Sequence, residues 1–263
     1  MQRPFVATLV LLSVVGCGRS KERAPEVKEP LRIAAAADLA RAFEDVGRVY
    51  ETRTGEKLTF TFGSTGLLAK QIREGAPFDV FAAANVSFAD DVVKSGACLA
   101  DTKTLYARGR IVVWAKEGEA PTLASLGDKR FVKVAIANPE HAPYGKAAKQ
   151  ALEKAGAWTT VSEKLVYGEN VQQALQFVQS GNAEAGIVAL SLAITAGGRY
   201  LEVDETLHAP LDQALVVCKG DGAKGANVER GRSFANFVGS KDGRAIMKRY
   251  GFLLPGEKLT AAP

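Results

Sequence analysis

The sequence predicts an α/β fold of two lobes, joined by a hinge and separated by a cleft. Short apolar runs alternate along the chain with segments whose apolar residues recur at helical spacing. The alternation occurs in two successive sets, which favours two sheets covered by helices. With 263 residues, 47% of them hydrophobic, the chain can fill two cores. We predict that residues 31–107 form the first part of lobe 1, residues 108–211 form lobe 2, and residues 212–263 return to lobe 1.

The first set of elements begins with the apolar run LRIAAAA at Leu31. A helix follows it, because Leu39, Phe43, Val46 and Tyr50 recur at helical spacing. We expect Asp38 to be the N-cap of this helix. The other elements expected in this set are a strand at 58–62, a helix at 67–75, a strand at 78–84, a helix at 86–96 and a strand at 110–115.

The second set of elements runs from the strand VKVAIAN to the strand YLEVD. Its expected elements are a strand at 132–138, helices at 145–156 and 170–181, and strands at 185–191 and 200–204. A strand at 213–219, a glycine-rich loop at 220–226 and terminal helices ending near residue 256 follow it, and we expect them to pack back on the first set. The two crossovers between the lobes are expected near residues 107–110 and 209–213.

The N-terminus has the features of an export signal. One early positive charge, Arg3, precedes an apolar run that is too short to span a membrane comfortably. The small residues before Cys17 resemble a bacterial lipobox, so we predict a lipoprotein signal peptide over 1–16 and a lipidated Cys17. An ordinary signal peptide with an incidental cysteine is the alternative. Residues 17–30 are polar, charged and proline-bearing, which is typical of a disordered tether.

Charge and cysteine content restrict the possible partners. The net charge is +5, but Lys and Arg are interspersed with Asp and Glu, so a nucleic-acid surface is not expected. In an oxidising compartment Cys98 and Cys218 could form a disulfide. Two buried thiols are equally compatible with the sequence.

Four loops share one design, in which a strand runs into a helix through small or hydroxyl-bearing residues. They are AAAADL at 34–39, FGSTGL at 62–67, NPEHAPYGKA at 138–147 and YGENVQQA at 167–174. The free backbone N–H groups at such helix starts, with the positive end of the helix dipole, suit a small anion. Ser64 and Thr65 would donate to it, while Gly63 and Gly66 let the backbone approach closely. A single loop of this kind is more often a plain helix cap, but its recurrence in both lobes favours anion binding.

The sequence gives little support for catalysis. Its two histidines, His141 and His208, do not accompany a G-x-S-x-G elbow, and it has no H-E-x-x-H or C-x-x-C metal motif. It also has no Walker A or G-x-G-x-x-G motif for a nucleotide. We therefore predict a protein that is not an enzyme, with no cofactor and no free metal cation. We expect His141 to be a loop or rim residue.

Several segments together resemble the molybdate-binding proteins of ABC transporters. The resemblance runs from about Leu31 to Phe252 and includes GAPFDVFAAA, GENVQQALQFVQSGNAEAGIVALS and the terminal MKRYGF. It implies the two-lobed fold of periplasmic binding proteins, closing on a tetrahedral oxyanion. It also implies a monomer that works with an ABC transporter permease. With the export signal, it places the protein on a lipid anchor, in the periplasm or on the outer face of the cell membrane.

The resemblance also implies site residues. The first hydroxyl donor of the family corresponds to Asp38 and the second to Thr65, beside Ser64. The backbone donors correspond to Tyr144 and Val171. Asp38 departs from the family pattern, because an ionised carboxylate cannot donate to a dianion and would repel it by several kcal/mol at about 4 Å.

We predict that Asp38 turns away to cap its helix and offers only its backbone N–H. The alternative is that it accepts a proton from the ligand, which would favour hydrogenphosphate over molybdate or sulfate. A second departure is Ala189, where some members of the family carry a tyrosine whose hydroxyl reaches the anion. Ser191, on the same side of the expected strand, could substitute for it. The resulting prediction is capture of molybdate or tungstate for uptake, with another oxyanion such as phosphate or sulfate as the alternative.

Overall fold

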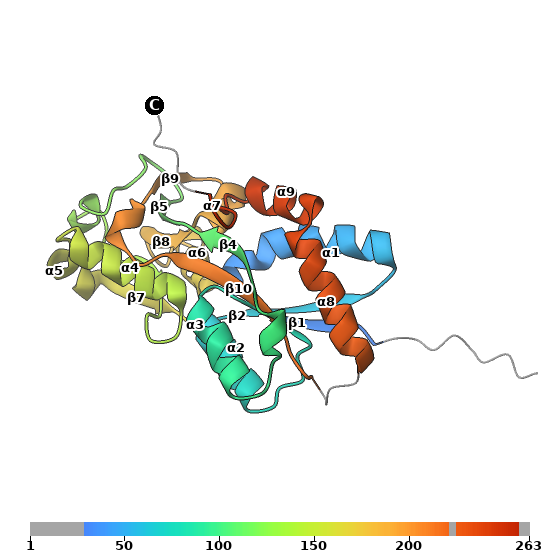
Figure 1. Cartoon of the computed structure of the whole chain (residues 1–263). Coiled ribbons are helices and arrows are strands. Elements are labelled where there is room, and N and C mark those ends of the chain that lie inside the picture. Colours follow the sequence, from blue (N-terminus) through green and yellow to red (C-terminus); the bar gives the residue numbers. More distant parts are fainter. Residues whose placement is uncertain (1–28, 221–224, 258–263) are drawn as a thin grey trace, which may run out of the picture.

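The computed structural model describes residues 29–220 and 225–257, which form two five-stranded sheets with helices packed on them (Figure 1). One sheet has the strand order β2-β1-β3-β10-β4, and the other has the order β7-β6-β8-β5-β9. We call the first sheet with its helices lobe 1 and the second with its helices lobe 2. The prediction of a two-lobed α/β fold is confirmed.

Lobe 1 is built from two separate stretches of the chain. In its sheet β1 pairs in parallel with β2 and β3, while β10 pairs antiparallel with β3 and β4. Its strands are β1 (Leu31–Ala36), β2 (Leu58–Gly63), β3 (Val80–Ala83), β4 (Thr104–Gly109) and β10 (Leu211–Val217). Its helices are η1 (Ala37–Leu39), α1 (Ala40–Thr54), α2 (Thr65–Arg73), α3 (Val86–Lys94), η2 (Ala100–Thr102), α8 (Gly225–Gly239) and α9 (Lys241–Arg249).

Lobe 2 is continuous in sequence. Its β6 pairs in parallel with β7 and β8, and β5 lies antiparallel between β8 and β9. Its strands are β5 (Ile111–Ala115), β6 (Val134–Ala137), β7 (Leu165–Gly168), β8 (Ala185–Ala189) and β9 (Arg199–Glu202). Its helices are η3 (Ser125–Gly127), α4 (Pro143–Lys154), α5 (Trp158–Val161), η4 (Ser162–Lys164), α6 (Val171–Gln179), α7 (Leu190–Ala196) and η5 (Glu205–Leu207).

Two short crossovers join the lobes. The chain leaves lobe 1 at Gly109 and enters lobe 2 at Ile111, and it returns through η5 to begin β10 at Leu211. The core of lobe 1 includes Phe43, whose ring meets the rings of Phe60 and Phe234 edge-on at 6.0 and 5.9 Å between centroids. Edge-to-face pairs of this kind add to the burial of apolar area. Because the apolar faces of α1 and α8 meet here, the returning segment is part of the core of lobe 1.

Two local predictions are wrong, and one strand was not predicted. Asp38 lies inside the 3-10 turn η1, and no side chain caps α1, which begins at Ala40. The strand expected over 185–191 ends at Ala189, so Ser191 lies on α7 and not on a strand. The strand β4 was absent from the expected elements, since TLYARG carries a charged residue and a short apolar pattern.

The predicted signal peptide over 1–16, the lipidation of Cys17 and nearly all of the tether over 17–30 fall outside the described residues. Within the ranges 29–220 and 225–257, no helix combines the length and hydropathy needed to cross a membrane.

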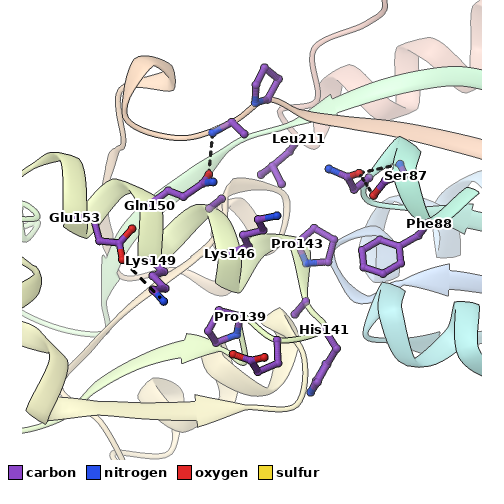
Figure 2. Close-up of a pocket in the computed structure, with 16 residues that line it drawn as sticks. Ser87, Phe88, Pro139, His141, Pro143, Lys146, Lys149, Gln150, Glu153 and Leu211 are labelled. Carbon is purple, nitrogen blue, oxygen red and sulfur yellow. Dashed lines mark hydrogen bonds and ion pairs between the residues drawn. The ribbon is translucent and has the colours of Figure 1, made fainter. Parts of the chain in front are cut away.

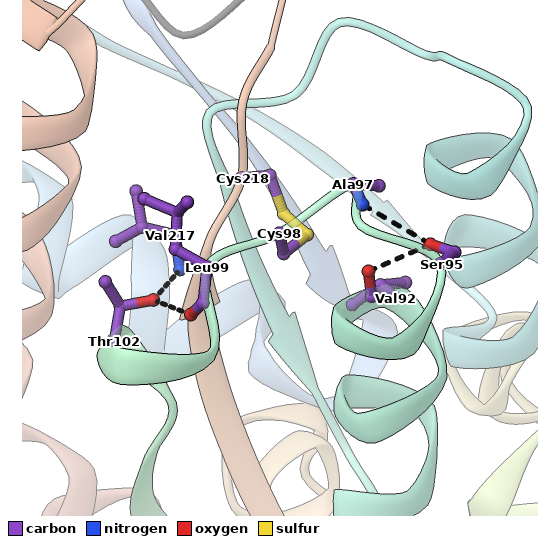
Figure 3. Close-up of a disulfide and its surroundings, with 8 residues drawn as sticks. All are labelled: Val92, Ser95, Ala97, Cys98, Leu99, Thr102, Val217 and Cys218. Atoms are coloured by element: carbon purple, nitrogen blue, oxygen red, sulfur yellow. Dashed lines mark hydrogen bonds between the residues drawn. A yellow bond between two sulfur atoms is a disulfide. The ribbon is translucent and has the colours of Figure 1, made fainter.

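A disulfide joins Cys98 to Cys218, 120 residues apart in the sequence (Figure 3). Cys98 lies in the loop after α3, and Cys218 follows the last residue of β10. Backbone hydrogen bonds flank the bond on both sides, from Leu99 N–H to Val217 at 2.8 Å and from Lys219 N–H to Ala97 at 2.9 Å. The disulfide therefore fastens the returning strand to the first half of lobe 1.

We expect the double variant Cys98→Ser, Cys218→Ser to lower the free energy of unfolding by about 2–5 kcal/mol, because a cross-link over a long loop restricts the unfolded chain. Urea unfolding of protein lacking residues 1–17 measures this loss. A count of two free thiols in the denatured, unreduced protein would contradict the bond.

Candidate oxyanion-binding site

The starts of four helical segments meet in the cleft between the lobes. Lobe 1 contributes η1 and α2, and lobe 2 contributes α4 and α6. They line a small cavity, in which about 10 Å³ is open to the centre of a water molecule. Its lining consists of Ala36, Ala37, Asp38, Gly63, Ser64, Thr65, Ala84, Ala142, Pro143, Tyr144, Asn170 and Val171. Because both lobes line so small a space, they are closed on each other.

Backbone N–H groups at three of these helix starts lack acceptors. The first N–H groups of an α-helix have no partner within the helix. Among the described residues, no acceptor binds the N–H groups of Thr65, Tyr144 or Val171. Pro143 gives α4 a first residue without an N–H, and the Asn170 side chain caps α6 at Gln172 and Gln173 but leaves Val171 free. The cavity is therefore surrounded by partial positive charges from three helix dipoles.

The hydroxyl of Thr65 is available to donate. Its Oγ1 accepts a hydrogen bond from Ala84 N–H at 3.2 Å, which fixes its position and leaves its own proton for another acceptor. Thr65 is buried at the start of α2. Thr65 can therefore offer both a backbone and a side-chain donor to one ligand.

The hydroxyl of Ser64 is engaged by the opposite lobe. Its Oγ lies 2.9 Å from the backbone oxygen of His141 and 2.8 Å from His141 Nδ1. A hydroxyl has one proton, so both contacts are hydrogen bonds only when Nδ1 carries a hydrogen and donates to Oγ. Gly66 N–H donates to the same His141 oxygen at 3.0 Å, and a Cβ at Gly66 would lie only 2.6 Å from that oxygen. Ser64 and Gly66 of lobe 1 therefore both bind His141 of lobe 2, so His141 takes part in the contact between the lobes.

Asp38 lies at the centre of a buried polar network. Its Oδ2 accepts hydrogen bonds from Tyr144 Oη at 2.9 Å and from Gln213 Nε2 at 2.6 Å. Tyr106 Oη donates to Gln213 Oε1 at 2.7 Å, which orients the amide so that its nitrogen faces Asp38. Ser191 Oγ donates to the backbone oxygen of Asp38 at 2.7 Å. The network joins α4 and α7 of lobe 2 to η1, β4 and β10 of lobe 1.

The carboxyl of Asp38 is only 1% exposed. Burial raises its pKa from 3.8 to about 6, although the hydrogen bonds from Gln213 and Tyr144, and a contact with the backbone N–H of Asp38 itself, act in the opposite direction. Within the described part of the chain its Oδ1 has no hydrogen-bond partner. The prediction that Asp38 turns away to cap its helix is therefore wrong. Two donors from β10 and α4 bind its side chain, and a residue inside η1 cannot cap α1.

The structure brings five of the predicted site residues to the cavity: Asp38, Ser64, Thr65, Tyr144 and Val171. Ser191 does not line it and instead supports Asp38 from α7. Sequence reasoning missed Gln213, Tyr106 and Asn170. The signal for Gln213 was a polar residue in the apolar run LDQALVV, and Asn170 was recognisable as an N-cap.

A second, larger hollow of about 470 Å³ follows the outer side of the same seam (Figure 2). It lies between the start of α3, one side of α4 and the crossover at Ala209–Leu211, and it shares Ala142 and Pro143 with the cavity. Two of its polar interactions are local, namely the Lys149–Glu153 pair and the Asn85 cap of α3. Since Thr65 and Val171 do not line it, we place the candidate site in the smaller cavity.

The described residues contain no group of three or more His, Cys, Asp or Glu side chains that could hold a metal ion. Two lobes that close on a cavity lined by uncharged donors, with one carboxyl among them, define a solute-binding protein. Comparison with known proteins leads to the same class. Residues 31–253 match the family model of the bacterial extracellular solute-binding proteins.

Two relatives and one solved structure illustrate this similarity. The chain is 35% identical to the molybdate-binding protein ModA of Azotobacter vinelandii, over 84% of this chain and 89% of that protein. It is 30% identical to a putative ABC transporter substrate-binding lipoprotein, YvgL, of Bacillus subtilis, over 94% and 96% of the two chains. The solved periplasmic molybdate-binding protein of Azotobacter vinelandii superposes with a TM-score of 0.78 at 29% identity, covering 86% of this chain and 99% of that one. The chain belongs to the bacterial extracellular solute-binding protein family, and its resemblance to the molybdate-binding proteins is confirmed.

We expect the stability of the ligand-free protein to fall as the pH rises from about 4 through about 6. The pKa of Asp38 in the folded protein lies above its ordinary value, so folding favours the protonated form. The stabilisation is complete at pH values below the pKa of Asp38 in the unfolded chain. It is lost as the pH rises through the pKa of Asp38 in the folded protein, a loss on the order of 3 kcal/mol. Urea unfolding of wild type and Asp38→Asn across this range measures it as the difference between the two curves.

The variant Asp91→Asn, which removes an exposed carboxylate on α3, is the control. Identical pH profiles for wild type and Asp38→Asn would show that Asp38 does not titrate in this way.

Proposed function

We propose that this protein captures molybdate, and also tungstate, outside the cytoplasm and delivers it to an ABC transporter permease. The observation that carries this proposal is the convergence of the free N–H groups of Thr65, Tyr144 and Val171 on one small cavity. The cavity lining, within the described residues, contains no Lys, Arg or His. The relatives with this fold include molybdate-binding proteins.

Neutral donors suit a ligand that must be bound tightly and later released. Helix N-termini hold a dianion with fixed dipoles, which need no reorganisation when the ligand enters. A lysine or arginine beside the anion would add a strong ion pair that must be broken on release. Thr65 contributes a hydroxyl and an N–H from lobe 1, while Tyr144 and Val171 contribute N–H groups from lobe 2. The ligand therefore completes the contact between the lobes.

Selectivity among dianions would follow from size. Sulfate has the charge of molybdate but is smaller, so it cannot reach all the donors of a cavity shaped for the larger anion. Each buried donor left without an acceptor costs about 1–3 kcal/mol. With three or four donors from two lobes, the summed cost of unpaired donors is large enough to decide which anion is bound.

Closure of the lobes depends on contacts between their facing loops. His141 binds Ser64 and Gly66, Tyr144 binds Asp38, and Ser191 binds the backbone of Asp38. A hinge at the two crossovers would break these contacts together and open the cavity to water. The closed arrangement then presents a defined surface of both lobes to the permease.

We further propose that the protein acts as a monomer, attached to the membrane by a lipid on Cys17. The sequence VVGC, the polar segment over 17–30 and the similarity to a substrate-binding lipoprotein support the anchor. Such an anchor would keep the binding domain at the membrane, near its transporter.

Calorimetric titration of the protein lacking residues 1–17 with molybdate, tungstate, sulfate and phosphate at neutral pH tests the substrate. We expect tight binding of molybdate and tungstate, and binding of sulfate and phosphate at least about 100-fold weaker, because the smaller anions leave donors unsatisfied. Tight phosphate binding without a response to molybdate would overturn the assignment.

We expect Thr65→Val to weaken molybdate binding about 10- to 100-fold, since it removes one hydrogen bond to a charged ligand, worth about 1.5–3 kcal/mol. Thr65→Ser keeps the hydroxyl and should bind within a few-fold of wild type. Thr61→Val, on the exposed face of β2, controls for the loss of a threonine elsewhere. Equal affinities of the two Thr65 variants would remove this hydroxyl from the site.

A further inference from the structure

The two oxygens of the Asp38 carboxyl have different surroundings. Oδ2 receives two donors, Tyr144 Oη and Gln213 Nε2. Oδ1 is buried and has no partner within the described residues, and Asp38 lines the cavity. Buried polar atoms are nearly always hydrogen-bonded, so an atom of this kind calls for an explanation.

An ionised Asp38 is incompatible with a bound dianion in this cavity. The lining contains no cationic side chain among the described residues, so only the partial charges of the helix starts oppose the repulsion between the carboxylate and the ligand. A protonated carboxyl removes the repulsion and becomes a donor. Oδ2 already accepts from Tyr144 Oη and Gln213 Nε2 whereas Oδ1 has no partner within the described residues, so we assign the proton to Oδ1.

The groups that face Asp38 permit this proton. Tyr144 on α4 and Tyr106 on β4 have pKa values well above their ordinary value because of burial, so both phenols stay neutral and act as donors. The neighbouring elements α6, α7 and β2 carry no titratable side chain in their sequences. On α1, Arg41 pairs with Glu44 at the surface.

Two further side chains on adjoining elements have partners of their own. On β10, Asp212 pairs with Arg108. His141, the other titratable group near the cavity, is bound to Ser64. The described surroundings of Asp38 therefore contain no ion pair that would keep it charged.

We propose that Asp38 binds the oxyanion as a neutral acid, with its Oδ1–H donating to a ligand oxygen, so that binding and lobe closure take up one proton. The inference rests on the proposed function and deepens it. The proton comes from the solvent or buffer, no bond of the oxyanion breaks, and the proton returns when the ligand leaves. The raised pKa of Asp38 in the closed structure agrees with this.

Closure and protonation support each other. Gln213 belongs to lobe 1, like Asp38, whereas Tyr144 belongs to lobe 2. Opening the lobes would remove Tyr144 and admit water, which favours the ionised carboxylate. The protein should therefore bind molybdate more weakly as the pH rises.

The test uses calorimetric titration of molybdate into the protein lacking residues 1–17; every described helix and strand lies after that segment. Titrations run between about pH 6 and pH 8.5, each in two buffers that differ in ionisation enthalpy. Wild type should take up close to one proton per ligand at the alkaline end, and its affinity should fall about tenfold for each pH unit there. The amide of Asp38→Asn can accept from Tyr144 and Gln213 and donate from the position of Oδ1–H.

Asp38→Asn should therefore bind with no proton uptake and constant affinity, and at pH 8.5 it should bind more tightly than wild type. Asp91→Asn is the matched control and should behave as wild type. Molybdate binding by wild type without proton uptake would overturn the inference and leave the proposed function intact. Proton uptake by wild type with loss of binding in a folded Asp38→Asn would also overturn it, since Asp38 would then be an acceptor for a protonated ligand.

If Asp38→Asn fails to fold, the proton uptake of wild type decides alone. If wild type fails to bind molybdate at any pH, the proposed function itself is wrong. The two failures are thus distinguishable.

Discussion

The structure of the cleft depends on one constraint. Backbone N–H groups at helix starts that face a closed cavity need hydrogen-bond acceptors. The first turns of α2, α4 and α6 bring unpaired donors to one small cavity between the lobes. Such donors are costly when buried and become favourable only when an acceptor joins them. At Gly66, the second residue of α2, any side chain would collide with the backbone of His141 from the other lobe. The same constraint makes the closed form depend on a ligand rich in acceptors.

The sequence predicted those features of the molecule that depend on residues near one another in the chain. The alternation of apolar runs and helical periodicity predicted two lobes, and the hydroxyl and glycine residues at the strand-to-helix junctions predicted four regions of the site. Thr65 was visible as a hydroxyl at a helix start, whereas Tyr144 and Val171 were assigned as backbone donors by the resemblance to a known family. The resemblance to a known family added the pairing of these loops across the cleft.

Long-range contacts were not predictable in this way. Gln213 lies 175 residues from Asp38, and Tyr106 lies 107 residues from Gln213. A single sequence does not say which buried polar groups meet, so Asp38 was assigned to a local cap when its partners are in β10 and α4. The mistake about Ser191 has the same origin. A buried run such as AGIVALS suits a strand or a helix, and only the tertiary fold ends β8 at Ala189.

The position of β10 has a consequence for the order in which the chain can fold. β10 lies between β3 and β4 in the sheet of lobe 1, yet it is the last of the strands to be synthesised. Until residue 217 is available, β3 and β4 lack the strand that joins them, whereas β5 to β9 of lobe 2 form one continuous segment. Non-local pairing of this kind slows folding, because a long loop must close first. Lobe 1 therefore completes its sheet after the whole of lobe 2 has emerged, and until then an incomplete chain leaves β3 and β4 with unpaired edges that can associate with other chains.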